Sequence, residues 1–288
     1  MLGPRPKDGK PWAVKVVAEL TTNHFGDRNR LEKLVRAAKS AGADYVKVQK
    51  RNVETFYTKE QLDAPYRSPF GKTFGDYRHQ LELDRDDFNY LNDLCKRVGI
   101  EWFASVLDMP SYEFILEFEP QLLKLPSTIS GHVEYLSAVA DRIDRPLVLS
   151  TGMTDKSFEQ WLLEKFRTCP TLFLLQCNSA YPTPMADCEV GVVRHYSRMA
   201  LQYPNIVPGY SSHDPGWFAS ALAVAAGAKM VEKHIKLGDS EWAHFDAVAL
   251  DVLSSAFNDY VTKIREAEIT MGSENKAIQP SEHHKYTN

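Results

Sequence analysis

Short apolar runs rich in β-branched residues alternate with longer amphipathic segments over most of the chain. Eight of these runs predict β-strands, at Ala13–Glu19, Tyr45–Gln49, Glu101–Val106, Leu122–Pro126, Pro146–Thr151, Thr171–Cys177, Ile206–Ser211 and Lys229–Ile235. The runs are apolar almost throughout, which indicates strands that are buried on both faces, as in a parallel sheet.

The segments between these strands have the periodicity of helices. After the first strand, one helical face carries the apolar residues Leu31, Leu34, Val35 and Ala38. The segment DRDDFNYLNDLCKRVGI begins with acidic residues and ends in basic residues and glycine, as helix polarity favours. Eight strand–helix units in 288 residues favour a closed (β/α)8 TIM barrel over an open doubly wound sheet.

We therefore expect a single α/β domain, a (β/α)8 barrel, over residues 13–270. An N-terminal extension (residues 1–12) precedes it, and a polar tail (residues 271–288) follows. Two segments depart from the repeat. Asn52–Gln80 is polar and aromatic and predicts an extended loop over the barrel mouth, and Val252 to about Thr270 predicts one more helix.

Composition narrows the classes of partner and compartment. Hydrophobic residues make up 43% of the chain and the formal net charge is −4, which gives no reason to expect a nucleic-acid or membrane partner. The four cysteines form no C-x-x-C pair, which favours a reducing compartment. Because no apolar run resembles a signal peptide or approaches the ~20 residues of a membrane span, we expect a cytoplasmic protein.

Polar side chains gather where the predicted strands end. In a (β/α)8 barrel the active site lies at the C-terminal ends of the strands. At or just after those ends lie Glu19, Lys47, Gln49, Ser105, Lys124, Ser127, Ser150, Ser179, Tyr181, Ser211, His213 and His234. Any single serine or lysine here is more often structural than catalytic. Two inward-facing lysines are harder to interpret as purely structural, because a buried ammonium group is costly without an anion such as phosphate or carboxylate.

His213 and His234 lie at the ends of adjacent predicted strands, so their side chains can converge on one ion. Two imidazoles together with a carboxylate and water suit a divalent metal such as Mn²⁺. Asp246 lies just after the last strand and can reach the same region, although a loop or helix-cap aspartate is an equally good interpretation.

Several motifs occur together in an order typical of one known family. They are AELTTNHFGD, AGADYVKVQ, LLKLPS, LVLSTGM, CNSAYPTP, GYSSHDPG, VEKHIKL and FDAVALD. Each motif alone is a weak signal, but the ordered set is specific and extends from about Val14 to Asp251. The chain thus resembles the sialic acid synthase (N-acetylneuraminate synthase) family over nearly all of the expected barrel.

The resemblance implies that the barrel binds phosphoenolpyruvate and an open-chain sugar aldehyde. It places the phosphate and carboxylate of phosphoenolpyruvate on Lys47, Lys124, Ser127, Ser150 and Ser211, with Ser105 and Ser179 beside them. It makes His213 and His234 the ligands of a metal, with Mn²⁺ expected and Mg²⁺ or Co²⁺ as alternatives. It also directs Gln49, Tyr181 and Asp246 toward the sugar, and gives Glu19 and Asp246 proton-transfer roles.

The resemblance also implies a reaction. The metal polarises the aldehyde, carbon C3 of phosphoenolpyruvate attacks it, water adds at C2, and inorganic phosphate leaves. Lysines beside the phosphate neutralise charge during these steps. The product is a 3-deoxy-2-keto sugar acid of the nonulosonic or a related type. Members of the family commonly dimerise, so a homodimer is expected.

The chain differs from the family's usual pattern in three respects, and all three concern recognition of the sugar rather than of phosphoenolpyruvate. No stretch matches the C-terminal antifreeze-like domain of many members, Ile129 stands where an acidic residue is common, and Ser212 stands where aspartate is common. We therefore hypothesise that the acceptor is not N-acetylmannosamine but another aldose or a modified amino sugar, with a phosphorylated one as an option.

Other functions remain open at this point. A 3-deoxy-ulosonate-phosphate synthase acting on an aldose phosphate is the nearest alternative, with Lys59, Arg67, Lys72 or Arg78 holding a distal phosphate, although a solvated loop surface explains these residues equally well. A Schiff-base aldolase could use Lys124 as its amine but would not need the histidine pair. A non-catalytic sugar-binding barrel is the third alternative. Such a protein would not need the paired lysines and histidines, yet all four are present.

Overall fold

Eight parallel strands close into a barrel, which confirms the predicted fold class. The computed structural model describes residues 13–240, 242 and 248–282. The barrel strands are β1 (Lys15–Thr21), β2 (Tyr45–Lys50), β5 (Glu101–Val106), β6 (Leu123–Leu125), β7 (Leu147–Ser150), β8 (Leu172–Cys177), β9 (Ile206–Ser212) and β10 (Met230–Lys236). Each pairs with the next in this order, and β1 pairs with β10 to complete the circle.

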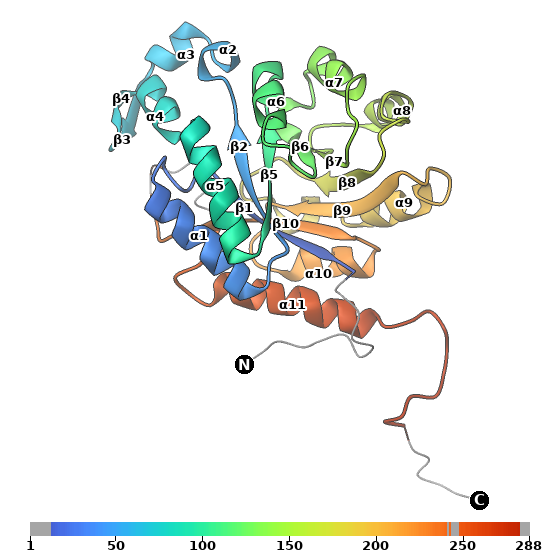
Figure 1. Ribbon diagram of the computed structural model, residues 1–288. Coiled ribbons are helices and arrows are strands. Elements are labelled where there is room, and N and C mark those ends of the chain that lie inside the picture. Colours follow the sequence, from blue (N-terminus) through green and yellow to red (C-terminus); the bar gives the residue numbers. More distant parts are fainter. Residues whose placement is uncertain (1–12, 241, 243–247, 283–288) are drawn as a thin grey trace, which may run out of the picture.

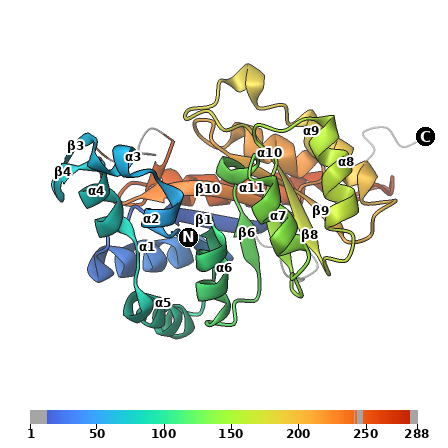
Figure 2. The same ribbon diagram turned by 90° about the horizontal axis from the view of Figure 1, so that it is seen from above.

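Helices surround the strands, as the views in Figures 1 and 2 show. They are α1 (Arg28–Ala41), α5 (Arg85–Val98), α6 (Met109–Leu116), α7 (Val133–Ala140), α8 (Lys156–Lys165), α9 (Gly191–Met199), α10 (Phe218–Ala225) and α11 (Ala256–Met271). Helix α1 begins after Asp27, whose side chain accepts a hydrogen bond from the backbone N–H of Arg30. It buries the apolar face predicted from the sequence and ends at Gly42, whose φ of 91° favours glycine.

Alternation along the strands divides the core into two parts. Outward side chains pack against the helices in one large cluster. Inward side chains near the strands' N-terminal ends form a separate apolar plug of Val17, Phe103, Leu122, Val148, Leu175 and Met230. Further along the same strands the inward positions become polar, so the plug forms the floor beneath a polar region at the C-terminal end of the barrel.

The prediction of an extended loop over Asn52–Gln80 was wrong. This insert contains α2 (Val53–Phe56), α3 (Lys59–Asp63), β3 (Pro65–Ser68), β4 (Gly71–Thr73) and α4 (Phe74–Leu81). Thr58 and Thr73 each cap a helix in a reciprocal capping box, which explains the local order. Its aromatic residues pack with Phe25 and Trp242 in a small core of their own.

The final predicted helix starts later than expected. Leu250–Asp251 form a short strand, β11, that pairs with β10, and α11 begins only at Ala256. Asp251 accepts hydrogen bonds from the backbone N–H groups of Gly238 and Leu253, which ties the end of β11 to the residues just after β10. Two 3-10 helices, η1 (Ser127–Ile129) and η2 (Met185–Asp187), complete the described elements.

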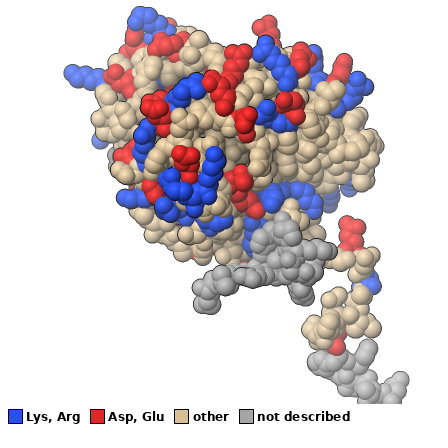
Figure 3. Space-filling model, viewed as in Figure 1, with Lys and Arg blue, Asp and Glu red and all other residues tan. Residues whose placement is uncertain are grey.

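Three further features concern the surface charge, the character of the helices and the cysteines. On the face shown in Figure 3, basic and acidic side chains are interspersed rather than gathered into patches of one sign. Within the described residues, no helix combines the length and apolar character that crossing a membrane would require. The four cysteines are all buried and unpaired.

Candidate active site

A buried cluster of charges lies inside the barrel above the apolar plug. The ammonium group of Lys47 on β2 contacts Glu19 Oε2 on β1 and lies 2.7 Å from Glu232 Oε1 on β10. Lys124 on β6 donates a hydrogen bond to Ser150 Oγ and lies 3.5 Å from Glu232 Oε2. All five side chains are almost fully buried. Residues from five different strands thus meet around one carboxylate.

The charges in this cluster shift each other's pKa values. Burial lowers the pKa of Lys47 to about 7, Glu232 opposes that shift, and Lys124 adds to it. Burial works against the ionised form of Glu232, but Lys124 and Lys47 outweigh it and lower the pKa of that carboxyl. The buried lysines thus have anionic partners within the chain itself, because the carboxylates of Glu19 and Glu232 compensate their charges.

Hydroxyl groups surround the cluster. Ser211 donates to Glu232 Oε1 at 3.2 Å, and Ser179 donates to Ser127 Oγ at 2.9 Å. Ser105 lies opposite Lys124 in the β5–β6 register, and its Oγ is fully buried without a hydrogen-bond partner among the described residues. A buried hydroxyl that lacks a partner indicates a place where a ligand's polar atom can bind.

Gly152, just after β7, allows the serines to approach closely. A Cβ atom at this position would lie 2.2 Å from Ser179 Oγ and 2.8 Å from Ser127 Cβ. These distances are far below van der Waals contact, so only glycine fits between the loops that follow β6, β7 and β8. The STGM motif thus has a packing reason as well as a place in the candidate site.

The two predicted metal-binding histidines converge as expected from their strands. The rings of His213 and His234 lie with their centroids 5.3 Å apart. His213 Nδ1 lies 2.6 Å from the backbone oxygen of Asn178, and His234 Nδ1 lies 2.7 Å from Thr21 Oγ1. Burial, with further contributions from His213 and Lys47, lowers the pKa of His234 well below its ordinary value. A neutral imidazole is the form that binds metal.

His213 and His234 could supply two ligands to a divalent metal, but two ligands alone do not form a complete metal site. The contacts at both Nδ1 atoms fix the ring orientations, as partners of metal-binding histidines generally do. Among the described residues, no group of three or more His, Cys, Asp and Glu side chains is arranged to hold a metal ion. Any further ligand would have to come from water or substrate, or from outside the described residues.

The residues predicted to face the sugar give a mixed result. Gln49 is half-buried on β2, where its Oε1 accepts a hydrogen bond from Arg51 at 2.6 Å. The ring of Tyr181 packs on that of His213, with centroids 4.1 Å apart. Asp246 lies outside the described residues.

Two sequence departures can be placed in the fold. Ile129 is fully buried in the cluster between strands and helices, so this position carries no polar group toward the barrel mouth. Ser212 points away from the mouth, where its hydroxyl donates to Asp214 Oδ1 and accepts from Lys233. The altered Ser212 therefore belongs to a structural network behind β9 and β10.

Glu232, which lies at the centre of the described charged cluster, was omitted from the site prediction. It lies two positions before His234 on the same strand, so alternation places both side chains inside the barrel. The same alternation, followed back two positions from His234, could have identified Glu232 from the sequence alone. The intervening Lys233 faces outward and bonds to Ser212 and the backbone oxygen of Asp214.

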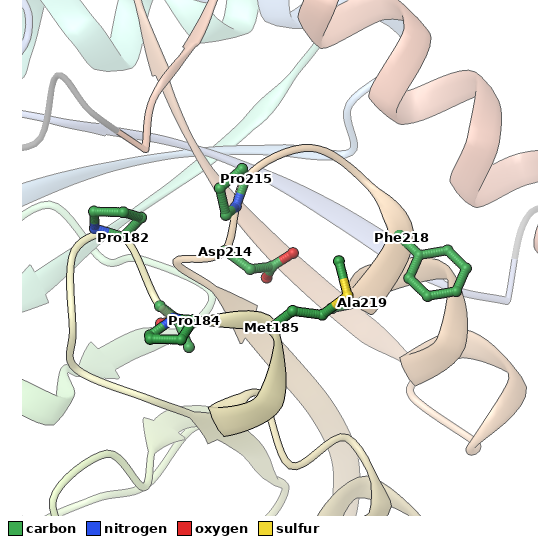
Figure 4. A pocket seen from close by; sticks show the side chains of 8 residues that line it. Pro182, Pro184, Met185, Asp214, Pro215, Phe218 and Ala219 are labelled. Carbon is green, nitrogen blue, oxygen red and sulfur yellow. The ribbon is translucent and has the colours of Figure 1, made fainter.

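The structure also contains a separate apolar pocket of about 300 Å³ (Figure 4). It lies between the loops after β8 and β9 and is lined by Pro182, Thr183, Pro184, Met185, Asp214, Pro215, Phe218 and Ala219. Its one ionisable side chain, Asp214, is occupied by hydrogen bonds from Tyr210 and Ser212. No cation lines the pocket, and the hydroxyl of Thr183 already donates to the backbone oxygen of Ala180, so the lining offers an anionic substrate no positive charge.

The closed parallel barrel and the polar cluster at its C-terminal end define a (β/α)8-barrel protein with its candidate site where enzymes of this fold bind substrate. The sequence pattern of the NeuB family matches residues 34–276, and the chain belongs to that family. The chain is 33% identical over 270 residues to the N-acetylneuraminate-9-phosphate synthase of Mus musculus. The aligned region covers 93% of this chain and 74% of the relative.

Two further similarities extend over similar lengths. The chain is 30% identical to the N,N'-diacetyllegionaminic acid synthase of Legionella pneumophila, covering 97% of this chain and 79% of the relative. The crystal structure of the N-acetylneuraminic acid synthetase of Leptospira borgpetersenii superimposes with a TM-score of 0.79 at 24% identity, covering 93% of this chain and 88% of that chain. This structural likeness supports the fold.

Proposed function

We propose that this protein is a synthase that joins phosphoenolpyruvate to the aldehyde of an open-chain sugar and releases inorganic phosphate. The observation that carries the proposal is the meeting of Lys47 and Lys124 around Glu232, beside the converging rings of His213 and His234. Cations for an anionic substrate and imidazoles for a metal lie together at one end of the barrel. Membership of the NeuB family supports this assignment of chemistry.

Phosphoenolpyruvate would bind through its phosphate and carboxylate. Lys47, Lys124 and Ser150 already form one connected group, and they would donate hydrogen bonds to these anionic oxygens. Ser105 would give its unpartnered hydroxyl to the same ligand. Ser127, Ser179 and Ser211 complete the surrounding hydroxyls.

The condensation forms one carbon–carbon bond and breaks one carbon–oxygen bond. Carbon C3 of phosphoenolpyruvate attacks the aldehyde carbon, and the aldehyde oxygen takes up a proton and becomes a hydroxyl. Water adds at C2 and loses one proton, which balances the proton taken up by the aldehyde oxygen. The C2–oxygen bond to phosphate then breaks, and the hydroxyl at C2 passes its remaining proton to the departing phosphate as the 2-keto group forms. Glu19, which contacts Lys47, would transfer protons in these steps.

A divalent metal held by His213 and His234, for which we propose Mn²⁺ with Mg²⁺ or Co²⁺ as alternatives, would polarise the aldehyde oxygen. Gln49 and Tyr181 would contact the sugar, and Asp246 would join them and assist proton transfer. We propose an acceptor other than unmodified N-acetylmannosamine, because Ile129 provides no acidic group for its hydroxyls.

The test is phosphate release from phosphoenolpyruvate with Mn²⁺ across aldoses, N-acylated amino sugars and aldose phosphates. We expect release that depends on one class of sugar and falls at least 100-fold in His213→Ala. His195→Ala is the matched control, because His195 is half-exposed on α9, where its Nε2 lies 3.0 Å from Glu159 Oε1. Absence of release with every sugar, together with calorimetry showing no binding of phosphoenolpyruvate, would favour a non-catalytic barrel.

A further inference from the structure

Two buried guanidinium groups lie together in the insert between β2 and α5. Arg51 directly follows β2, and Arg78 is on α4; they are 6% and 3% exposed. Both lie against the ring of Tyr57, with their guanidinium carbons 5.8 Å and 5.4 Å from its centroid. Burying two like charges so close together is costly unless anions compensate both.

Only one carboxylate compensates this pair among the described residues. Arg51 forms an ion pair with Glu82 at 3.0 Å and also donates to Tyr57 Oη and Gln49 Oε1. Arg78 has no ion pair within the described part of the chain, and its Nε is buried there without a hydrogen-bond partner. Burial, and then the charge of Arg51, lower the pKa of Arg78. The pair therefore carries one positive charge more than its surroundings balance.

The arginine pair borders the candidate active site. Gln49, which accepts from Arg51, lies two positions after Lys47 on the same face of β2, a rise of about 7 Å along the strand. Phe56 of the insert stacks on His132 from the loop after β6, with centroids 6.3 Å apart. The insert thus reaches across this side of the mouth, and the arginines lie beyond the position proposed for the sugar.

The other basic residues of the insert do not share these properties. Lys59, Arg67 and Lys72 are exposed, and Lys59 already pairs with Asp63 at 2.7 Å. Of the four basic residues that the sequence suggested for a distal phosphate, only Arg78 is withdrawn from water and lacks an anion. Its partner Arg51 was not among them.

We propose that Arg51 and Arg78 form a subsite for a terminal phosphate on the acceptor sugar. This inference rests on the proposed function, because it specifies the acceptor of that same reaction. The planar guanidinium group matches phosphate oxygens in a two-pronged geometry, which lysine lacks. A phosphate here would lie at the end of the acceptor remote from the aldehyde, with Gln49 contacting the sugar between them.

The experiment compares two acceptors that differ only in the terminal group. Initial rates are measured with N-acetylmannosamine and with N-acetylmannosamine 6-phosphate, at saturating phosphoenolpyruvate and Mn²⁺. We expect wild-type kcat/KM to be higher for the phosphorylated sugar, and we expect Arg78→Gln to reduce this preference about 10- to 100-fold. Arg78→Lys, which keeps the charge but loses the paired donors, is expected to give an intermediate ratio.

Lys72→Gln is the matched control, since it removes an exposed cation from the same insert and should leave the ratio unchanged. Equal use of both acceptors by the wild type would overturn the subsite while leaving the proposed function intact. So would a preference that survives in Arg78→Gln, or an equal loss for both acceptors, which would indicate a structural role. Turnover of neither acceptor, nor of any other sugar in the panel, would instead overturn the proposed function.

Discussion

At the scale of single residues, Glu232 has the most consequential position in the barrel. It is the shared partner of Lys47, Lys124 and Ser211, and each of these comes from a different strand. A buried ion cluster is not in itself a strong source of stability, because each charge loses its hydration on folding. Removing one member alone is different, because the remaining charges lose their compensation.

We therefore expect Glu232→Gln to lower the free energy of unfolding by about 3–5 kcal/mol, because Lys124 would lose the carboxylate it contacts and Lys47 would keep only its contact with Glu19. Urea denaturation followed by circular dichroism measures this change. Glu266→Gln serves as control: its partner Lys263 is half-exposed, so the cost should stay below about 1 kcal/mol. Equal effects of both substitutions would show that the cluster contributes nothing beyond a surface ion pair.

The lowered pKa of Lys47 predicts proton uptake on binding. With a pKa of about 7, much of Lys47 is neutral at pH 8, whereas a bound phosphate or carboxylate favours its ammonium form. Phosphoenolpyruvate should thus bind more weakly as the pH rises above 7, and binding at pH 8 should take up protons. Calorimetry in buffers of different ionisation enthalpy counts these protons.

The same titration on Lys47→Met gives the reference for protons taken up by the ligand itself. The wild type should exceed this reference at pH 8, and the difference should shrink toward pH 6, where Lys47 is already charged. No excess at pH 8 would show that the ammonium form already predominates in the free protein.

At the scale of elements, two patterns explain what could be predicted from the sequence. Short apolar runs identified all eight barrel strands, and period-two alternation correctly placed Lys47 and Gln49 on one face of β2. The order within Asn52–Gln80 could not be predicted in this way, because it depends on capping boxes and on aromatic contacts with Trp242, 162 residues beyond Gln80 (242 − 80). The compensation of the lysines by Glu19 and Glu232 was also missed, since it requires strands that are distant in sequence to meet.

The loop after β7 offers a test of close packing between elements. Gly152→Ala would push a methyl group into Ser127 and Ser179, so we expect a loss of about 1–3 kcal/mol in unfolding free energy and weaker binding of phosphoenolpyruvate. Gly131→Ala is the matched control, because nothing lies within 4 Å of the place its new methyl group would take and its φ is not positive. If the two variants have equal melting temperatures, the loops adjust without cost.

At the scale of the whole molecule, closure joins segments from the two ends of the barrel sequence. Strand β1 lies between β2 and β10, and α11 packs beside α1 and α10. Arg265 of α11 donates to the backbone oxygen of Val14 and forms an ion pair with Asp44 at 2.8 Å. This buried arginine ties the last helix to the first strand and to the turn before β2.

We expect Arg265→Ala to lower the free energy of unfolding by about 3 kcal/mol, because the carbonyl of Val14 and the carboxylate of Asp44 lose their common partner. Thermal denaturation provides the measurement. Arg142→Ala should change stability by less than about 1 kcal/mol, since its pair with Glu113 is exposed. A large loss in the Arg142 variant alone would contradict this account of closure.

The pairing of β1 with β10 also determines when, during synthesis of the chain, the residues of the candidate site come together. Glu19 leaves the ribosome more than 200 residues before Glu232 and His234, yet these side chains meet only when the circle closes (232 − 19 = 213). Until β10 has emerged, β1 and β9 therefore each lack a neighbour on one side, and both open edges are able to pair with other chains. A nascent chain halted before β10 would hold both lysines and neither Glu232 nor His234, so the proposed sites for substrate and metal can be complete only after β10 has joined the barrel.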